Sequence, residues 1–487
     1  CTRGRVDAAV AIDEVKKFIA QRDLDAATRY VPPVVTPTCA GGFDQKIAII
    51  GAGPAGLSCA FYLAEKGYKP VVFEKNERPG GMLTYGIPSF KLQKDVIEAE
   101  VEVIRLMGAE FRYGVEVGRD VTLDELRAQG FKAFYVAIGC QGGRLAGIPG
   151  EDAEDVTVAV DFLREVNSGK IDALPGRTIV VGGGNVAIDV ARNACRLGSE
   201  HVEMFCLESE AQMPASEEER REAIEDGAHI SCGWGPKEVH LDVAGRVCGI
   251  TFKRCTRVFD DEGRFAPEYD ENDLRRVDAD RVVMSIGQSI VWGDLLAGSK
   301  VELGRGQGAL ADPQTYQTAE PDIFVGGDVY TGPSFAIDAI AAGHEAAVSI
   351  HRFVQPGSTL TIGRNQRRYT ALDRDDVVIE SYDNASREVA HVDREREKAA
   401  PFSEYVETFT EEQVRAETAR CLGCGASIVD PNKCIGCGLC TTKCAFDAIH
   451  LDRDRPECST MVKYEQKLPS LGRYALKRAI KIKFGRK

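Results

Sequence analysis

A chain of 487 residues with 44% apolar side chains is long enough for about three domains, each with a core of its own. Its net charge of −14 argues against nucleic acid as a main partner, because phosphate binding needs a basic surface. The sequence contains no run of 18 apolar residues, so it predicts no membrane span.

The 16 cysteines are unevenly spread, and seven of them lie between Cys421 and Cys458. A small secreted domain held by disulfides would carry cysteines throughout. A dense cluster near the end of a large chain favours metal binding in a reducing cytoplasm, where we expect the protein. Because the sequence begins at Cys1 and not at methionine, we expect its natural start to be missing or processed.

In chain order, the first element is a short helix over "VAIDEVKKFIAQRDL", followed by a proline-rich linker. From Lys46 the pattern is that of a buried strand ("IAII"), a glycine turn, a helix ending at Gly67 and a second strand, "PVVFEKN". The same order recurs over 177–207. A strand, a loop and a long helix are expected over 322–354.

The first glycine turn has the form Gly-x-Gly-x-x-Gly between a strand and a helix, where backbone N–H groups and the helix dipole can hold a pyrophosphate. Glu74 ends the next strand, where an acidic residue accepts a ribose hydroxyl. The alternative is a glycine turn kept for tight packing. The residues expected to bind this first nucleotide are Gly51, Gly53, Pro54, Ala55, Gly56, Glu74 and Lys75.

The segment "DIFVGGDV", with Gly326, Gly327 and Asp328, resembles the second FAD fingerprint of flavoproteins that bind two dinucleotides. The resemblance implies that Asp328 holds the ribityl chain; the alternative is a helix N-cap. "FYVAIGC" and "RVVMSIGQ" resemble the crossover strands between the FAD and NAD(P) domains of these proteins.

The second glycine turn is the Gly-x-Gly-x-x-Ala variant, and it lies between the two FAD segments, which predicts an inserted domain. FAD together with a second dinucleotide indicates hydride transfer between nicotinamide and flavin. The alternative is a vestigial turn. The residues expected at this second nucleotide are Gly182, Gly183, Gly184, Asn185, Val186, Ala187 and Glu208.

The tip of the following strand selects between NAD and NADP. An arginine pair there would hold a 2′-phosphate, but Leu207 and Glu208 occupy the positions. Glu208 would bond the free ribose hydroxyls and repel a phosphate, so the sequence favours NAD(H) over NADP(H). Two alternatives stay open: Glu208 as a solvated surface acid, and Arg220 and Arg221 as phosphate ligands.

Four cysteines near the C-terminal end, in "CIGCGLCTTKC", have the spacing C-x2-C-x2-C-x3-C of a ferredoxin [4Fe–4S] site, with Ala445 in place of the usual proline. An upstream pair of cysteines, Cys421 and Cys424, could contribute to a second cluster. Two clusters need eight thiolates, however, and only seven lie here, counting Cys458. The pair is otherwise a spare thiol pair or a zinc site. The expected metal ligands are Cys434, Cys437, Cys440 and Cys444, with Cys421 and Cys424 as the open pair.

Together these motifs resemble the small subunit of glutamate synthase and its relatives, the large subunit of NADH-dependent ferredoxin:NADP oxidoreductase and the N-terminal half of dihydropyrimidine dehydrogenase. The matching pieces include "CTRGRVDAAVAI", "PGGMLTYGIPSFKL", "VVGGGNVAIDVARNACRLG" and "FVGGDVYTGPSFAIDAIAAG". The resemblance adds FAD contacts at Gly81, Met82 and Leu83, and it matches Cys1 to a ligand of an upstream iron–sulfur domain.

The expected fold is α/β, with two Rossmann-like dinucleotide-binding domains, the NAD(P) domain inserted in the FAD domain, and a small C-terminal ferredoxin-like domain. The expected bounds are 1–44 for a remnant of an iron–sulfur domain, 45–145 and 315–355 for the FAD domain, 146–314 for the NAD(P) domain, 356–410 for a linker, 411–460 for the ferredoxin-like [4Fe–4S] domain and 461–487 for a basic tail.

The expected function is a flavin-dependent oxidoreductase subunit that moves electrons between NAD(P)H, FAD and iron–sulfur clusters. The expected acceptor is ferredoxin or a companion iron–sulfur or flavin subunit in a hetero-oligomeric complex, with electron bifurcation left open. Such chemistry requires no acid, base or nucleophile from the protein, so no catalytic residue is named. The alternatives are a glutamate synthase small subunit and a non-catalytic scaffold that holds FAD.

Overall fold

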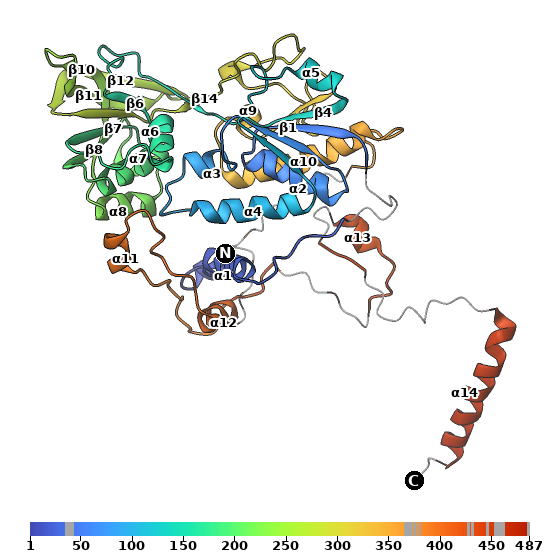
Figure 1. Cartoon of the computed structure of the whole chain (residues 1–487). Helices are drawn as coiled ribbons and strands as arrows, with labels where there is room; N and C mark the ends of the chain where they lie inside the picture. The colour runs from blue at the N-terminus through green and yellow to red at the C-terminus, as the bar shows by residue number, and fades with distance from the viewer. Residues whose placement is uncertain are drawn as a thin grey trace. The chain divides into compact units, whose positions relative to one another are not determined.

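The computed structural model describes residues 1–34, 43–364, 373, 377, 379, 381–425, 429, 433–444, 448–451 and 463–484. The chain divides into two compact units (Figure 1). The first consists of Cys1–Gly363 and Ile379–Leu422, and the second of Arg364–Val378 and Gly423–Lys487.

The first unit contains a parallel five-stranded sheet in the order β15-β4-β1-β2-β3. Its central strands are almost continuously buried, as expected when both faces of a parallel sheet are covered. The strands are β1 (Lys46–Ile50), β2 (Val71–Glu74), β3 (Glu110–Tyr113), β4 (Phe131–Val136) and β15 (Ile323–Val325).

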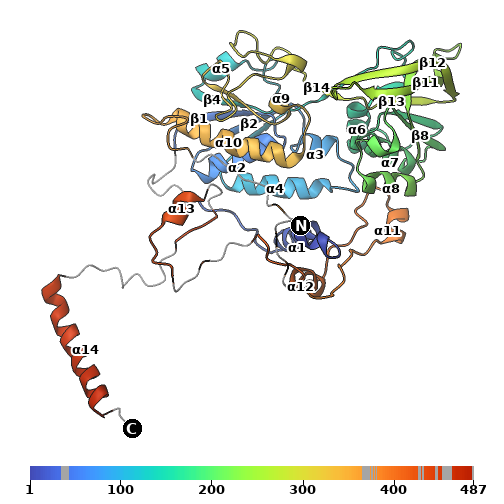
Figure 2. The same cartoon turned by 180° about the vertical axis from the view of Figure 1, so that it is seen from behind.

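Helices α2 (Pro54–Glu65) and α10 (Ala336–Val354) pack against each other beneath this sheet, with α4 (Lys94–Leu106) beside them (Figures 1 and 2). Helix α5 (Leu123–Ala128) lies on the opposite side, and the short helix α3 (Met82–Tyr85) precedes α4. This arrangement confirms the predicted first Rossmann-like domain.

A second parallel sheet, in the order β6-β13-β7-β8-β9, forms the inserted domain and confirms the second Rossmann-like unit. Its strands are β6 (Val156–Val158), β7 (Arg177–Val181), β8 (His201–Cys206), β9 (His229–Cys232) and β13 (Arg281–Met284). The helices of this domain are α6 (Ala159–Asn167), α7 (Asn185–Arg196) and α8 (Glu217–Glu225).

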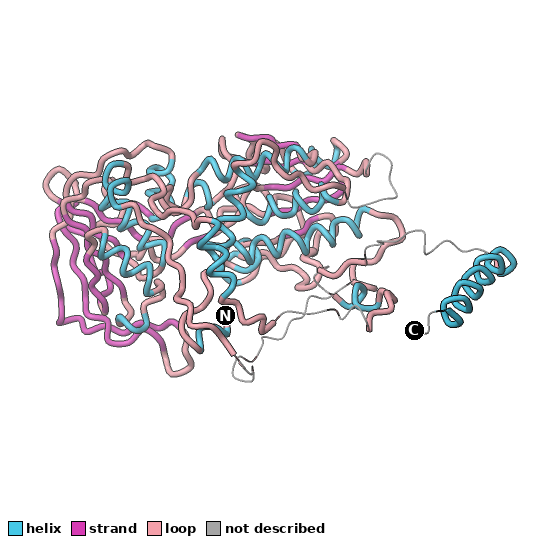
Figure 3. The backbone as a smooth tube through the Cα atoms, turned by 90° about the horizontal axis from the view of Figure 1, so that it is seen from below, coloured by secondary structure: helices cyan, strands magenta, loops and turns pink. Residues whose placement is uncertain are grey.

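An antiparallel sheet, which the sequence did not predict, packs on the inserted domain. It consists of β10 (Trp234–Leu241), β11 (Val247–Phe259) and β12 (Phe265–Val277). The rings of Phe205 and Phe252 stack 3.9 Å apart and join it to the parallel sheet. Figure 3 shows these strands gathered at one end of the first unit.

The two domains are joined by a pair of connections, as the crossover motifs predicted. Strand β5 (Gly142–Gly143) follows β4, strand β14 (Gln288–Ser289) follows β13, and the two pair antiparallel. The chain therefore leaves the FAD domain and returns to it along adjacent strands.

The end of the inserted domain differs from the prediction. Residues 146–314 were assigned to the inserted domain, yet Leu295 and Ala309 pack with Ile50 and Val325 in the core of the first sheet. The segment around them is irregular, with only the short helix η3 (Arg305–Gln307), so no periodic pattern marked its return to the FAD domain.

The predicted long helix after β15 is divided into two helices. Asp328 begins α9 (Asp328–Thr331), and Gly332 and Pro333 separate it from α10. Proline removes a backbone donor and the preceding glycine has a positive φ of 78°, so one continuous helix is not formed.

The terminal segments of the first unit also differ from the prediction of a linker over 356–410 and a ferredoxin domain from 411. That stretch holds α11 (Arg394–Ala399) and α12 (Glu411–Ala419), and α12 contacts α1 (Ile12–Leu24). The buried side chain of Arg420 contacts Glu417 of the same helix at 2.6 Å and the exposed Asp7 of the N-terminal segment at 3.0 Å. Residues 411–422 therefore belong to the first unit.

The second unit holds α13 (Leu439–Lys443) and α14 (Tyr464–Phe484). Helix α14 carries the basic tail predicted over 461–487. Across the helices of the described residues, none is both long and apolar enough to cross a membrane.

Candidate functional site

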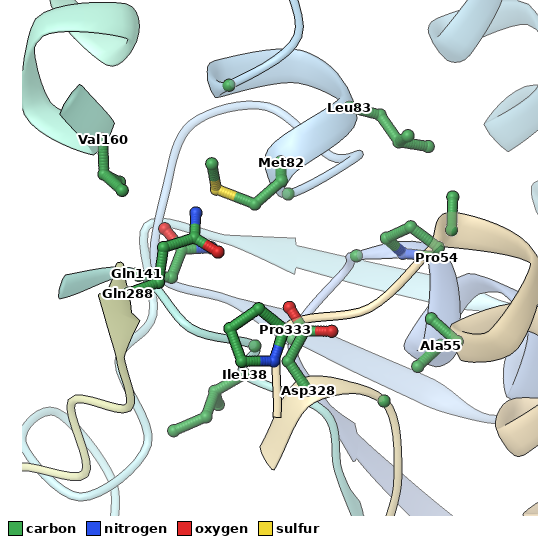
Figure 4. A pocket seen from close by; sticks show the side chains of 18 of the residues that line it. Pro54, Ala55, Met82, Leu83, Ile138, Gln141, Val160, Gln288, Asp328 and Pro333 are labelled. Carbon is green, nitrogen blue, oxygen red and sulfur yellow. The ribbon is translucent and has the colours of Figure 1, made fainter. Parts of the chain in front are cut away.

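A cavity of about 860 Å³ lies in the first unit, between the carboxyl ends of the first sheet and the inserted domain. This is the edge at which parallel α/β sheets bind dinucleotides. Figure 4 shows Met82, Ile138, Asp328 and Gln288 around the space, drawn from both domains.

Most of the residues predicted for the first nucleotide line this cavity. Gly56 is not among them: a Cβ there would overlap the carbonyl oxygen of Gly51, so Gly56 allows the helix to pack against the turn. Those lining the cavity are Gly51, Gly53, Pro54, Ala55, Glu74, Lys75, Gly81, Met82, Leu83, Gly327 and Asp328.

The two glycine turns approach the crossover connections in the same way. Gly51 has a φ of 105°, and a Cβ on it would lie 2.5 Å from the carbonyl oxygen of Ala137. Gly182 has a φ of 142°, and a Cβ on it would overlap the carbonyl oxygen of Ser285. In both domains the turn therefore lies against the strand end that leads to the other domain.

The first turn forms a cradle that fits the pyrophosphate of FAD. A Cβ on Gly81 would lie 2.9 Å from the Cα of Gly53, so the two glycines leave room where a phosphate group needs close backbone approach. Helix α2 begins directly behind the turn, with Pro54 at its first position. The residues present thus fit the dinucleotide that the motif predicted.

Glu74 is buried at the end of β2 with its carboxylate fixed by backbone donors. Oε2 accepts a hydrogen bond from the amide of Ala52 at 2.8 Å, and Oε1 accepts one from the amide of Asn76 at 2.9 Å. The side chain lines the cavity and keeps acceptor capacity for a ribose hydroxyl.

Asp328 points into the cavity beside Pro333 (Figure 4). Burial raises the pKa of its carboxyl, while backbone hydrogen bonds from Ser334 and Cys140 lower it. Asp328, the first residue of α9, lines the cavity, so a ligand there can reach its carboxylate.

At the second glycine turn, Gly184, Asn185 and Val186 line the cavity, whereas the remaining predicted residues lie behind it. Asn185 Oδ1 accepts a hydrogen bond from the amide of Ser216 at 3.1 Å. Ala187 is fully buried in the core of the inserted domain. The predicted residues outside the cavity lining are Gly182, Gly183, Ala187 and Glu208.

Glu208 follows β8 and lies next to the second glycine turn. A Cβ on Gly183 would lie 3.0 Å from its Oε2 atom, so the carboxylate faces the turn. Glu208 is thus adjacent to the place where the adenosine ribose of a dinucleotide lies in this fold. Of the two predicted alternatives for a phosphate ligand, Arg220 donates to the carbonyl of Glu210 at 2.8 Å and Arg221 lies 3.8 Å from Glu218.

Sequence reasoning missed several residues of the cavity wall. Lys91, Asp189 and Glu219 form an ionic cluster there, and Gln141 and Gln288 lie where the two domains meet. Lys91 belongs to the quoted motif "PGGMLTYGIPSFKL", but no spacing rule pairs it with an aspartate 98 positions later.

In the second unit Cys434 and Cys437 precede α13, Cys440 lies within it and Cys444 follows it directly. Cys434, Cys437 and Cys440 are exposed. Gly436 and Gly438 have φ angles of 67° and 77°, which allow the tight loop that the spacing needs. The amide of Ala448 donates to Cys444 Sγ at 3.3 Å, and such N–H···S bonds favour thiolate ligands.

The donor set therefore fits a [4Fe–4S] cluster in its chemistry. Within the described residues no three Cys, His, Asp or Glu side chains are already gathered as a metal site. Cys421 and Cys424 are both exposed, and Cys458 lies outside the described residues.

Comparison with known families agrees with this division of the chain. The family model of pyridine nucleotide-disulphide oxidoreductases matches residues 45–343, and that of 4Fe-4S binding domains matches residues 427–450. Among solved structures, FprA from Mycobacterium tuberculosis in complex with NADPH has a TM-score of 0.54 and 19% identity, covering 63% of this chain and 84% of that chain. At this identity the likeness shows the fold alone.

Three curated relatives are similar over most of the chain. The beta subunit of NADP(+)-dependent formate dehydrogenase from Moorella thermoacetica is 34% identical over 87% of this chain, which spans 63% of that protein. The small chain of glutamate synthase [NADPH] from Escherichia coli (strain K12) is 34% identical over 73% of this chain and 77% of its own length. The PreT subunit of NAD-dependent dihydropyrimidine dehydrogenase from the same strain is 33% identical, with coverage of 73% and 78%.

These similarities confirm the resemblance to the small subunit of glutamate synthase, and with it an FAD-dependent oxidoreductase that carries a [4Fe–4S] domain. The chain belongs to the pyridine nucleotide-disulphide oxidoreductase family and adds to it a C-terminal 4Fe-4S binding domain.

Proposed function

We propose that this chain is the pyridine-nucleotide subunit of an electron-transfer complex, in which reducing equivalents pass between NAD(P)H, FAD and the C-terminal cluster. The observation that carries the proposal is the single cavity lined by both glycine turns, with Gly53 and Gly81 on one wall and Gly184 and Asn185 on the other. Flavin supplies the exchange between electron pairs and single electrons that links a nicotinamide to an iron–sulfur cluster.

The protein's own part is to bind and orient. The cradle of Gly53 and Gly81 and the carboxylates of Glu74 and Asp328 support FAD, and Asn185 and Val186 support the nicotinamide dinucleotide. Ala159, Val160 and Leu163 form an apolar part of the cavity wall, which would restrict water in the cavity when the cofactors are bound.

We propose NADH as the preferred nucleotide. The support is Glu208 beside the second turn, because a carboxylate accepts hydrogen bonds from free ribose hydroxyls and repels a 2′-phosphate. The names of the relatives include both NADP-dependent and NAD-dependent proteins, so they do not decide the matter. Steady-state kinetics with both nucleotides test it, and a lower KM for NADPH would contradict it.

We propose a companion redox subunit or a ferredoxin as the acceptor. The similarity to the formate dehydrogenase beta subunit covers 87% of this chain, compared with 73% for the glutamate synthase small chain. Because the similarity to the formate dehydrogenase subunit covers more of this chain, it favours a redox-complex subunit of that kind over a glutamate synthase small chain.

We also propose that Cys421 and Cys424 hold part of a second iron–sulfur cluster. Analysis of iron and sulfide per chain gives the number of clusters.

The second candidate function is that of a glutamate synthase small subunit, which the 34% identity to that protein supports. Purification from the native source with bound partners separates the two. A large subunit that uses glutamine and 2-oxoglutarate would favour glutamate synthase, whereas a ferredoxin or a dehydrogenase subunit would favour the first proposal.

A further inference from the structure

The wall of the cavity carries an ionic cluster of Lys91, Asp189 and Glu219, none of which belongs to the predicted cofactor-binding residues. Lys91 Nζ lies 2.6 Å from an Asp189 carboxylate oxygen and also contacts Glu219. Lys91 lies in the FAD domain, in the loop before α4, whereas Asp189 lies on α7 and Glu219 on α8 of the inserted domain. The cluster therefore joins the two dinucleotide domains at the wall of the site.

Phe90 anchors the same loop from behind. Its side chain is buried, and the guanidinium carbons of Arg192 and Arg196 lie 4.8 Å and 4.2 Å from its ring centroid. The ring of Phe402, from the segment that precedes α12, lies 6.4 Å away. These cation–π and aromatic contacts hold the loop against α7, beside the carboxylates that Lys91 contacts.

Two carboxylates contact the ammonium of Lys91, and two further cations lie close to Asp189. Asp189 faces Lys91 of the loop, Glu219 of α8, Arg192 of its own helix and Lys94 of α4. Burial raises the pKa of the Asp189 carboxyl to about 6, although Lys91 acts in the opposite direction. Carboxylates with perturbed pKa values cluster at functional sites, and this one lies in the wall of the cavity.

We propose that Lys91 is a positioning residue for hydride transfer: its contacts with Asp189 and Glu219 hold the inserted domain against the FAD domain, and a proton on Asp189 loosens that hold. The inference rests on the proposed function, because it concerns the distance between the two dinucleotides. Hydride transfer depends steeply on this distance, and a displacement of about 1 Å can slow a reaction by about 100-fold.

The kinetic test compares the full-length, FAD-loaded chain with Lys91→Gln, Asp189→Asn and the control Lys132→Gln, which removes an exposed lysine of β4. Flavin reduction by NADH is followed anaerobically in single turnovers. Lys91→Gln should slow it about tenfold or more at neutral pH with unchanged FAD content. The wild-type rate should fall as pH drops through about 6, and Asp189→Asn should show no such fall.

A second readout does not depend on activity. Hydrogen–deuterium exchange in the full chain should rise at residues 85–93 and in α8 of Lys91→Gln, and stay unchanged in Lys132→Gln. Wild-type rates together with wild-type exchange in Lys91→Gln would overturn the proposal, as would a pH-dependent fall that persists in Asp189→Asn. If no nucleotide reduces the wild-type flavin, the proposed function fails, while the exchange comparison still decides whether Lys91 joins the domains.

Discussion

At the scale of single residues, Glu208 and Asp189 carry the clearest chemical consequences. Both are carboxylates of the inserted domain close to the second glycine turn, but Glu208 would act on the bound nucleotide and Asp189 on the position of the domain. Glu208 faces the turn from outside the cavity, where it would meet the adenosine end of a dinucleotide. Asp189 faces Lys91 inside the cavity wall, where it would set the position of the whole domain.

The double substitution of Leu207 and Glu208 by arginine should reverse the nucleotide preference. It removes the repulsive carboxylate and supplies two donors for a 2′-phosphate. We expect the ratio of kcat/KM for NADPH over NADH to rise about 100-fold, a change of about 3 kcal/mol. Glu208→Gln is the control, since it removes the charge alone and should change the ratio less. An unchanged ratio in the double variant would show that Glu208 does not face the nucleotide.

Asp189→Asn should stabilise the fold at high pH while it slows electron transfer. Burial raises the folded-state pKa of this carboxyl to about 6 from an ordinary 3.8, so the ionised form costs stability above about pH 6. As pH falls through about 6 and then below 4, the cost disappears. We expect the Tm of Asp189→Asn to exceed that of wild type by about 2 °C or more at pH 8, and the gap to close near pH 4. A lower Tm at pH 8 would contradict the assignment.

At the scale of elements, the strand–turn–helix units decide whether FAD is held. Gly51→Ala introduces a Cβ 2.5 Å from the carbonyl oxygen of Ala137 at a φ of 105°. Gly108→Ala is a matched control, because Gly108 has a φ of 108° but meets only Lys69, at 3.8 Å. We expect Gly51→Ala to purify with little FAD and Gly108→Ala to keep it. Equal FAD absorbance in both would show that the turn tolerates the side chain.

Helix α12 is held to the N-terminal segment by the buried side chains of Glu417, which accepts a hydrogen bond from the amide of Ala11 at 2.8 Å, and of Arg420, which donates to the carbonyl of Ala8 at 2.7 Å. Glu417→Ala leaves the guanidinium of Arg420 buried with fewer partners, which in buried pairs costs about 3–5 kcal/mol. Denaturant unfolding should show a loss of this order. Glu412→Ala, an exposed position of the same helix, is the control and should stay close to wild type. Equal stability of the two variants would show that the pair does not hold the helix.

The elements that the sequence predicted well are those with local signals. Gly51, Glu74 and Gly182 are each explained by a motif of fewer than about 30 residues, and the structure places the two glycines at the expected turns and Glu74 at the end of β2. Residues that act through long-range contacts had no such signal. Tyr405 was predicted to lie in a charged linker, but its hydroxyl accepts a 2.8 Å hydrogen bond from Arg192.

The boundary near residue 290 and the antiparallel sheet were missed for related reasons. Leu295 and Ala309 pack in the core of the first sheet but lie in an irregular segment, so no periodic pattern in the sequence predicted their position. Strand β12 is mostly exposed and rich in charge, so its sequence lacks the alternation of apolar residues that identifies a half-buried strand. Lys91 was missed because its two partners lie in another domain.

At the scale of the whole molecule, the two units divide the chemistry. The first unit holds both glycine turns and the proposed dinucleotide sites, and the second holds the four cysteines of the ferredoxin spacing. Cys440→Ser should remove the iron of this cluster and leave FAD and its reduction by NADH intact, because the cysteine belongs to the other unit. Cys248→Ser, in β11, is the control and should keep full iron content. Loss of FAD from Cys440→Ser would contradict this independence.

The proposed route takes electrons from the nicotinamide through the flavin to the iron–sulfur cluster. A direct test is anaerobic mixing of the purified chain with NADH, with flavin absorbance and the paramagnetic signal of the reduced cluster followed in the same sample. We expect the flavin to bleach first and the cluster signal to appear afterwards, and only the bleaching to remain in Cys440→Ser. A cluster that stays oxidised while NADH is consumed, or a flavin that never bleaches with either nucleotide, would contradict it.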